Sequence, residues 1–306
     1  MNPLRARAED YLAMRRSLGY KLWRDGRLLL DFTDHLARAG QATITTRAAI
    51  EWATQPAGAA PSWWRIRLSV VRCFARYLQA LDPACEVPPT GLLPATGTRI
   101  TPYLYSPADI AALVHAAGTL AAPLKAATFQ TLISLLAVTG MRVGEAVALG
   151  RSDVDLEAGL LTVTGKYGKV RLVPLHPTTT GMLRGYAIRR DQLCPEPASQ
   201  TFLISTAGTR LRVPKIDETF ATLLALAGVE APGRHRRPRI HDLRHTFAVA
   251  TYLRWHKEGA DVQASLPVLS TFLGHVSPAS TWWYLQATPE LLALAAEQLE
   301  PLKEES

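Results

Sequence analysis

The first 86 residues carry apolar side chains at helical spacing. Between Tyr11 and Leu36 these side chains recur every three or four positions, which is the period of amphipathic helices. The same reasoning predicts a third helix over Thr45 to Ala53. A fourth is predicted over Ser62 to Leu81, capped at Pro61-Ser62. This part of the chain is therefore predicted to be a four-helix-type bundle.

The stretch from Val87 to Thr98 interrupts the pattern, because it is rich in proline and glycine and has neither helical nor strand periodicity. It predicts a domain boundary. We expect a first domain over 1–86, a linker over 87–104 and a second domain over 105–306.

The second domain is predicted to be mostly helical around a small sheet. Ser106 and Asp109 occupy capping-box positions of one helix, and the apolar stretch Leu124 to Val138 stops at Gly140. Two apolar runs around Gly165-Lys166-Tyr167-Gly168 predict a β-hairpin, and helical patterns resume near Thr178. The predicted fold class is mainly α with a small antiparallel β-sheet.

Composition and charge limit the classes of partner and the cellular location that the chain is expected to have. The formal net charge of +8 favours a polyanion such as nucleic acid or acidic lipid. No apolar run is long enough to cross a membrane and no signal-peptide core follows Met1, so a cytoplasmic location is expected. The three cysteines are widely spaced and odd in number, which argues against a disulfide framework or a zinc site.

The fourth predicted helix alternates arginines with apolar residues. Arg65, Arg67 and Arg72 can project from the polar side of this helix, where guanidinium groups suit bidentate phosphate contacts. The alternative is a solvated basic face that binds nothing.

Four short segments of the second domain stand out together. They are Thr139-Gly140-Met141-Arg142-Val143-Gly144-Glu145, Gly165-Lys166-Tyr167-Gly168-Lys169, His241-Asp242-Leu243-Arg244-His245-Thr246, and Leu273-Gly274-His275 followed by Thr281-Trp282-Trp283-Tyr284. Their order, spacing and residue types resemble the tyrosine recombinase family, also called the phage-integrase family. The resemblance covers the whole second domain. It extends more loosely to the first domain, where Arg67 to Leu78 looks like the DNA-gripping helix of the family.

The resemblance implies a catalytic set, and the chemistry of the residues agrees with it. Tyr284 would attack a backbone phosphate, while Arg142 and Arg244 would hold its oxygens, because arginine binds phosphate bidentately and keeps its proton. A tyrosine hydroxyl has a pKa of about 10, so it needs help to attack near neutral pH. His241 or His275 could receive the proton of the hydroxyl.

Supporting roles follow for several neighbours. Lys166 would protonate the leaving 5′ oxygen, although Lys169 on the same hairpin could be confused with it. Glu145 is expected to orient Arg142, and His245 is either a hydrogen-bonded supporting residue or a contact residue. The basic run Arg234 to Arg239, with Arg236 and Arg237, would line a DNA channel or form a solvated loop.

The predicted function is therefore a site-specific DNA recombinase. Cleavage by Tyr284 would give a 3′-phosphotyrosyl link and a free 5′-hydroxyl, and strand exchange would reverse the attack on a partner duplex. 

The bond energy is conserved in that link, so the reaction requires no nucleotide cofactor and no metal, and the sequence contains no Walker loop or Cys/His ligand set. Two alternatives stay open: a type IB topoisomerase-like enzyme that relaxes DNA, and a catalytically silent DNA-binding regulator.

The resemblance also implies partners. Members of the family act on paired sites in double-stranded DNA as tetramers, and a mobile-element or resolution system is the expected setting. The apolar stripe of the tail from Thr288 to Leu302 either folds back on its own domain or docks into an adjacent protomer.

Overall fold

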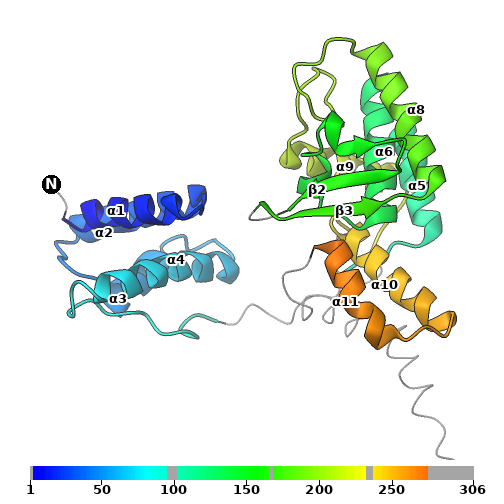
Figure 1. The fold of residues 1–306 in the computed structure, drawn as a ribbon. Coiled ribbons are helices and arrows are strands. Elements are labelled where there is room, and N and C mark those ends of the chain that lie inside the picture. The colour runs from blue at the N-terminus through cyan, green and yellow to red at the C-terminus, as the bar shows by residue number, and fades with distance from the viewer. Residues whose placement is uncertain (1–2, 95–101, 166–167, 232–236, 275–306) are drawn as a thin grey trace, which may run out of the picture. The chain divides into compact units, whose positions relative to one another are not determined.

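The computed structural model describes residues 3–94, 102–165, 168–231 and 237–274. The chain divides into two compact units, Met1–Arg99 and Ile100–Ser306 (Figure 1). Each unit has its own hydrophobic core. The mainly helical fold class predicted from the sequence is confirmed.

The first unit contains four helices within its described residues: α1 (Pro3–Ser17), α2 (Trp23–Arg38), α3 (Thr46–Thr54) and α4 (Pro61–Gln79). Their apolar faces meet in a core that includes Phe32, Trp52 and Phe74, which are completely buried. The helix α4 begins one residue earlier than predicted. Pro61 occupies its first turn, where a missing N–H costs nothing, and Ala60 rather than Ser62 is the N-cap residue.

Part of the predicted linker packs against this bundle. Leu93 is buried in the core of the first unit, and Val87 packs against the same core. The guanidinium group of Arg72 on α4 donates to the carbonyl oxygens of Pro88 at 2.7 Å and Pro89 at 2.8 Å. The chain therefore follows α4 for several residues after the helix has ended.

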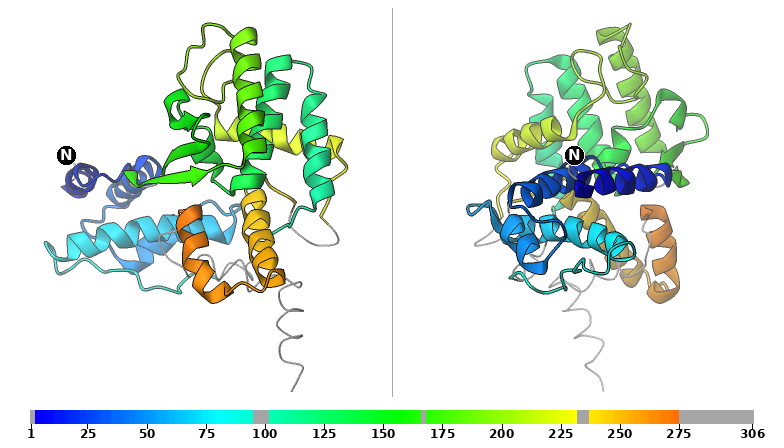
Figure 2. Two further views of the ribbon diagram at one scale, coloured as in Figure 1. Left: turned by 45° about the vertical axis from the view of Figure 1, so that its right-hand side comes forward. Right: turned by 90° about the vertical axis from the view of Figure 1, so that its left-hand side faces the viewer.

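The second unit combines helices with one small sheet (Figure 2). Its described helices are α5 (Pro107–Gly118), α6 (Pro123–Thr139), α7 (Val143–Ala146), a 3-10 turn (Arg151–Asp153), α8 (Pro177–Leu193), α9 (Val213–Leu226), α10 (Asp242–Lys257) and α11 (Val262–Leu273). The capping box at Ser106 and Asp109 is confirmed. None of the helices in the described ranges is long and apolar enough to span a membrane.

The sheet has three antiparallel strands in the order β1 (Val154–Asp155), β2 (Leu160–Thr164) and β3 (Val170–Pro174). The hairpin of β2 and β3 was predicted, whereas β1 is too short to leave a pattern in the sequence. Val163 pairs with Arg171 and Leu161 with Val173. This register turns Val173 toward the core and places Arg171 on the same face of β3.

The helix α6 lies at the centre of the second unit, with buried side chains on every side. It ends at Gly140, as predicted, and this glycine has a left-handed backbone with φ of 58°. The helix α11 ends in the same way at Gly274, with φ of 68°. Both ends expose backbone carbonyl groups that have no partner within their own helix.

Candidate active site

Arg244 is held at the C-terminal ends of both α6 and α11. Its side chain leaves the first turn of α10, and the residue is only 2 % exposed. One terminal nitrogen, Nη1, donates to the carbonyl of Gly140 at 2.8 Å, and Nη2 donates to the carbonyl of Leu273 at 2.8 Å. A cation is favoured at the C-terminus of a helix, where the carbonyl dipoles carry partial negative charge. The two helices thus fix the guanidinium group from two sides.

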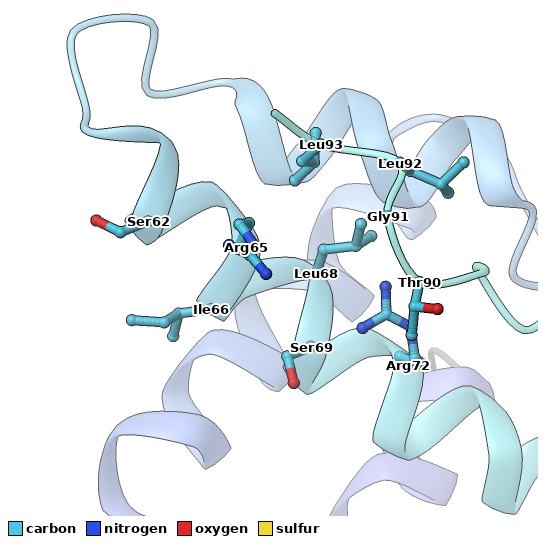
Figure 3. A pocket seen from close by; sticks show the side chains of 10 residues that line it. All are labelled: Ser62, Arg65, Ile66, Leu68, Ser69, Arg72, Thr90, Gly91, Leu92 and Leu93. Atoms are coloured by element: carbon cyan, nitrogen blue, oxygen red, sulfur yellow. The ribbon is translucent and has the colours of Figure 1, made fainter. Parts of the chain in front are cut away.

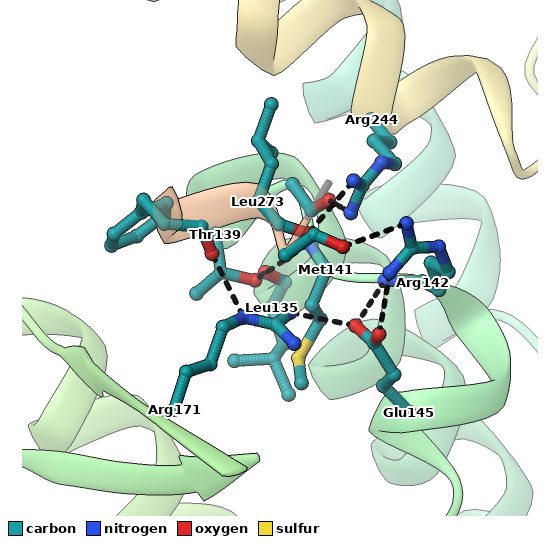
Figure 4. A network of polar contacts seen from close by, with 11 residues as sticks. Leu135, Thr139, Met141, Arg142, Glu145, Arg171, Arg244 and Leu273 are labelled. Carbon is teal, nitrogen blue, oxygen red and sulfur yellow. Dashed lines mark hydrogen bonds and ion pairs between the residues drawn. The ribbon is translucent and has the colours of Figure 1, made fainter. Parts of the chain in front are cut away.

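Arg142 reaches the same end of α11 from another element (Figure 4). It is the N-cap residue of α7, and its Nη2 donates to the carbonyl of Gly274 at 3.1 Å. Its side chain is 29 % exposed. The structure therefore brings together the two arginines that the sequence singled out, one buried and one partly open to solvent.

Glu145 holds Arg142 in place, in the role expected from the sequence. Its carboxylate accepts from the backbone N–H of Arg142 at 3.1 Å and from Nη1 of the same residue at 2.7 Å. It also accepts from Arg171 on β3 at 2.7 Å. Burial raises the pKa of Glu145, but the hydrogen bonds from Arg171 and Arg142 outweigh it, so the net pKa is lowered. The group is a carboxylate near neutral pH.

His241 stands at the N-cap position of α10, one turn before Arg244. Burial lowers the pKa of His241, and the positive charge of Arg244 lowers it further. The imidazole is therefore neutral near pH 7 and can accept a proton. Asp242, which follows, is not the N-cap residue of α10. It accepts instead from the backbone and side chain of Arg239.

His245 lies next to His241 in space. Their ring centroids are 5.1 Å apart, and the rings meet edge to face. His245 is buried, and its Nε2 is 3.9 Å from a carboxylate oxygen of Asp242. This buried placement favours a supporting role for His245 over direct contact with DNA.

Several predicted site residues lie outside the described residues: Tyr284, His275, Lys166 and Arg236. Their roles stay predictions. Lys169 is described and exposed on the hairpin, where its carbonyl accepts from Gly165 at 2.8 Å. Arg237 is exposed and donates to the carbonyl of Ala221 at 3.1 Å.

The arginines of α4 were predicted to project from the polar side of the helix, but they are not all exposed. Arg67 is 7 % exposed, lies 3.7 Å from the ring centroid of Trp52 and donates to the Trp52 carbonyl at 2.9 Å. Its guanidinium group packs in the core of the bundle, which favours a structural role over the predicted phosphate contact. Arg65 is exposed. Together with Arg72 it lines a cavity of about 400 Å³, closed on one side by residues 90–93 (Figure 3).

Arg171 is a site residue that the sequence reasoning missed. Its trace in the sequence is a charged residue inside a predicted strand, between Val170 and Leu172. The strand parity is set by Val173, which is buried. The alternation of residues alone leaves open which face of the strand is buried, because both faces carry an apolar residue.

Comparison with known proteins agrees with this geometry. Residues 105–290 match the model of the phage integrase family. The chain belongs to this family, whose members include the tyrosine recombinases. A protein of Sinorhizobium fredii (strain NBRC 101917 / NGR234), y4rB, named as an integrase/recombinase, is 43 % identical, and the match covers 98 % of each chain.

One more distant relative and one solved structure also match most of the chain. Tyrosine recombinase XerC of Chlamydia trachomatis serovar L2 is 28 % identical, over 78 % of this chain and 70 % of its own length. The Tn1549 transposon integrase, in complex with a circular intermediate DNA, is similar in structure with a TM-score of 0.69 and 16 % identity. That match covers 97 % of this chain and 100 % of the other. At this identity the similarity establishes a shared fold.

Proposed function

We propose that this chain is a site-specific recombinase in which Tyr284 cleaves DNA. The Tyr284 oxygen forms a bond to phosphorus while the bond from phosphorus to the 5′ oxygen breaks. This leaves a 3′-phosphotyrosyl link and a free 5′-hydroxyl. Attack by the 5′-hydroxyl of a partner strand reverses the step and rejoins the DNA. The observation that supports this most is the meeting of Arg142 and Arg244 at the end of α11.

The two arginines can stabilise the charge that develops on the phosphate oxygens. Each is fixed before substrate binds, by carbonyl groups and by Glu145, so little reorganisation is needed in the transition state. Arg244 contributes from the buried side and Arg142 from the more open side. Arginine keeps its positive charge throughout the pH range of the reaction.

Proton transfer requires one base and one acid. His241 or His275 would accept the proton of Tyr284. The lowered pKa of His241 keeps its ring neutral near pH 7, which is the form that can take up a proton. Lys166 would give a proton to the leaving 5′ oxygen, with Lys169 as the alternative on the same hairpin. The site requires no nucleotide, because the phosphotyrosyl bond retains the energy for rejoining.

The partner that we propose is double-stranded DNA with paired recombination sites. The net charge of +8 favours binding to a polyanion. A lambda integrase of the same fold has been solved as a tetramer bound to a Holliday junction. We infer a similar tetramer for this chain. A setting in a mobile element and a cytoplasmic location, where DNA is accessible, agree with this function.

The test is covalent capture of DNA. The protein is mixed with sheared genomic DNA and denatured, and DNA that stays attached to protein is recovered and sequenced. We expect fragments that share one site, and none with Tyr284→Phe. Tyr252→Phe on α10 is the matched control and should still capture DNA.

Other outcomes identify other functions. Adducts without a common sequence, together with relaxation of any supercoiled plasmid, would indicate a type IB topoisomerase. DNA binding without any adduct would indicate a silent regulator. Adducts formed by Tyr284→Phe would refute the assignment of the nucleophile.

A further inference from the structure

Arg171 lies on the inward face of an edge strand. Its side chain is 12 % exposed, while Val170 and Leu172 on the opposite face of β3 are each 60 % exposed. Turning two apolar residues outward and a guanidinium group inward is unfavourable unless the charge finds partners. The position of Arg171 is therefore explained by what it binds.

The partners of Arg171 are two parts of the arginine site. Its Nη2 donates to Glu145 at 2.7 Å, and its Nε donates to the carbonyl of Phe272 at 2.9 Å. Glu145 is the carboxylate that also binds Arg142. The single guanidinium group of Arg171 thus connects β3 to α7 and to α11 (Figure 4).

The end of α11 is held by three arginines in succession. The carbonyl of Phe272 accepts from Arg171, that of Leu273 from Arg244 and that of Gly274 from Arg142. These are carbonyl groups that a helix end leaves without partners in the helix. Arg171 and Arg142 share the Glu145 carboxylate and bind carbonyls two residues apart, at Phe272 and Gly274, so displacing one changes the surroundings of the other.

Gly274 fits closely against Arg171. A Cβ atom at this position would lie 2.8 Å from Nη1 of Arg171, and φ of 68° is strained for other residues. The backbone that supplies the carbonyl for Arg142 is therefore packed directly on the side chain of Arg171. His275 follows at the next position of the sequence.

We propose that Arg171 is a positioning residue for the cleavage reaction. It acts through Glu145 and the end of α11 to set the place of the Arg142 guanidinium group. Because Arg171 stands two residues after Lys169, the same contacts fix the hairpin relative to the arginine site. This inference rests on the proposed function for its effect on rate, but the contacts can be tested without it.

The first test is single-turnover cleavage of the captured DNA site at saturating protein. Arg171→Gln removes the charge and the fork of donors, and misplacement of about 1 Å in a catalytic group costs roughly 10²-fold in rate. We expect a fall of this size with DNA affinity unchanged, and an intermediate rate for Arg171→Lys. Arg184→Gln removes an exposed arginine of the same unit and serves as the matched control. Wild-type cleavage by Arg171→Gln would refute the proposal.

A double-mutant cycle tests the route through Glu145. If Arg171 acts through this carboxylate, Arg171→Gln combined with Glu145→Gln should be about as slow as the slower single variant. Rate losses that multiply would show that the two residues act independently and would overturn the proposal.

A third measurement needs no activity. Amide hydrogen exchange at Arg142, whose N–H is bonded to Glu145, should be faster in Arg171→Gln than in wild type and in Arg184→Gln. Unchanged exchange would refute the positioning role. Faster exchange in a protein that forms no adduct would instead leave the positioning contacts supported and refute the proposed function.

Discussion

The arginines of α4 and those of the second unit use the same chemical group in different ways. On α4, Arg65, Arg67 and Arg72 are close together in the sequence, yet Arg67 stacks on Trp52 and Arg72 binds the carbonyls of Pro88 and Pro89. Two of the three therefore serve the structure of their own unit. Arg65, the most exposed of them, stays the best candidate for a phosphate contact.

In the second unit the arginines are far apart in the sequence and meet in space. Arg142, Arg171 and Arg244 come from three elements and bind neighbouring carbonyls at the end of α11. Arginines that are close together in the sequence therefore indicate less about function than arginines from distant elements that bind the same helix end. The following predictions separate structural arginines from those that act on DNA.

Among the arginine variants, the largest effect is expected for Arg244→Lys. A lysine cannot donate to the carbonyls of Gly140 and Leu273 with a fixed fork, nor bind phosphate bidentately. Loss of one fixed donor of this kind costs roughly 10²- to 10³-fold in rate. Single-turnover adduct formation measures the change, and circular dichroism checks that the variant is folded.

The matched variant is Arg67→Lys in the first unit. Below its unfolding temperature it should form the adduct at nearly the wild-type rate, because Arg67 is buried against Trp52. An equal loss of rate in folded Arg67→Lys and Arg244→Lys would remove the distinction between the two units.

A pair of glycines tests the helix ends. Gly140→Ala places a Cβ atom against Phe247 and 2.9 Å from Leu273, in a left-handed backbone, whereas the Cβ atom of Gly40→Ala meets no atom within 4 Å. Both variants carry backbone strain of about 1–2 kcal/mol. The free energy of unfolding should fall by about 1–3 kcal/mol more in Gly140→Ala, because its new Cβ atom overpacks the core. Gly140→Ala should also lose adduct formation. Denaturant unfolding of each variant measures the difference, and equal losses would contradict it.

Local patterns in the sequence predicted most of the elements. The cap at Ser106, the end of α6 at Gly140 and the hairpin of β2 and β3 each depend on a few adjacent residues. The motifs singled out Arg142, His241 and Arg244 as candidate site residues, and the structure brings the two arginines together at the end of α11. Glu145 was assigned a role that its hydrogen bonds support.

The features that the sequence did not predict depend on contacts between distant parts of the chain. Arg67 looked like a surface residue until Trp52 was placed beside it, because helical periodicity does not tell which arginine faces a neighbouring helix. Arg171 was missed because its partners, Glu145 and Phe272, come from other elements. Local propensity contains no information about such partners.

The smallest effects are expected on α4, where Arg67→Gln and Arg65→Gln should change different properties. Arg67→Gln removes a stacked guanidinium group and a buried hydrogen bond, so the free energy of unfolding should fall by about 2 kcal/mol. Arg65→Gln should leave stability nearly unchanged and lower the slope of log affinity against log salt by about 1. Binding titrations at several salt concentrations and denaturant unfolding measure the two effects. A reduced salt slope for Arg67→Gln, with no loss of stability, would mean that Arg67 leaves Trp52 to bind phosphate, and the division between structural and DNA-binding arginines on α4 would then be wrong.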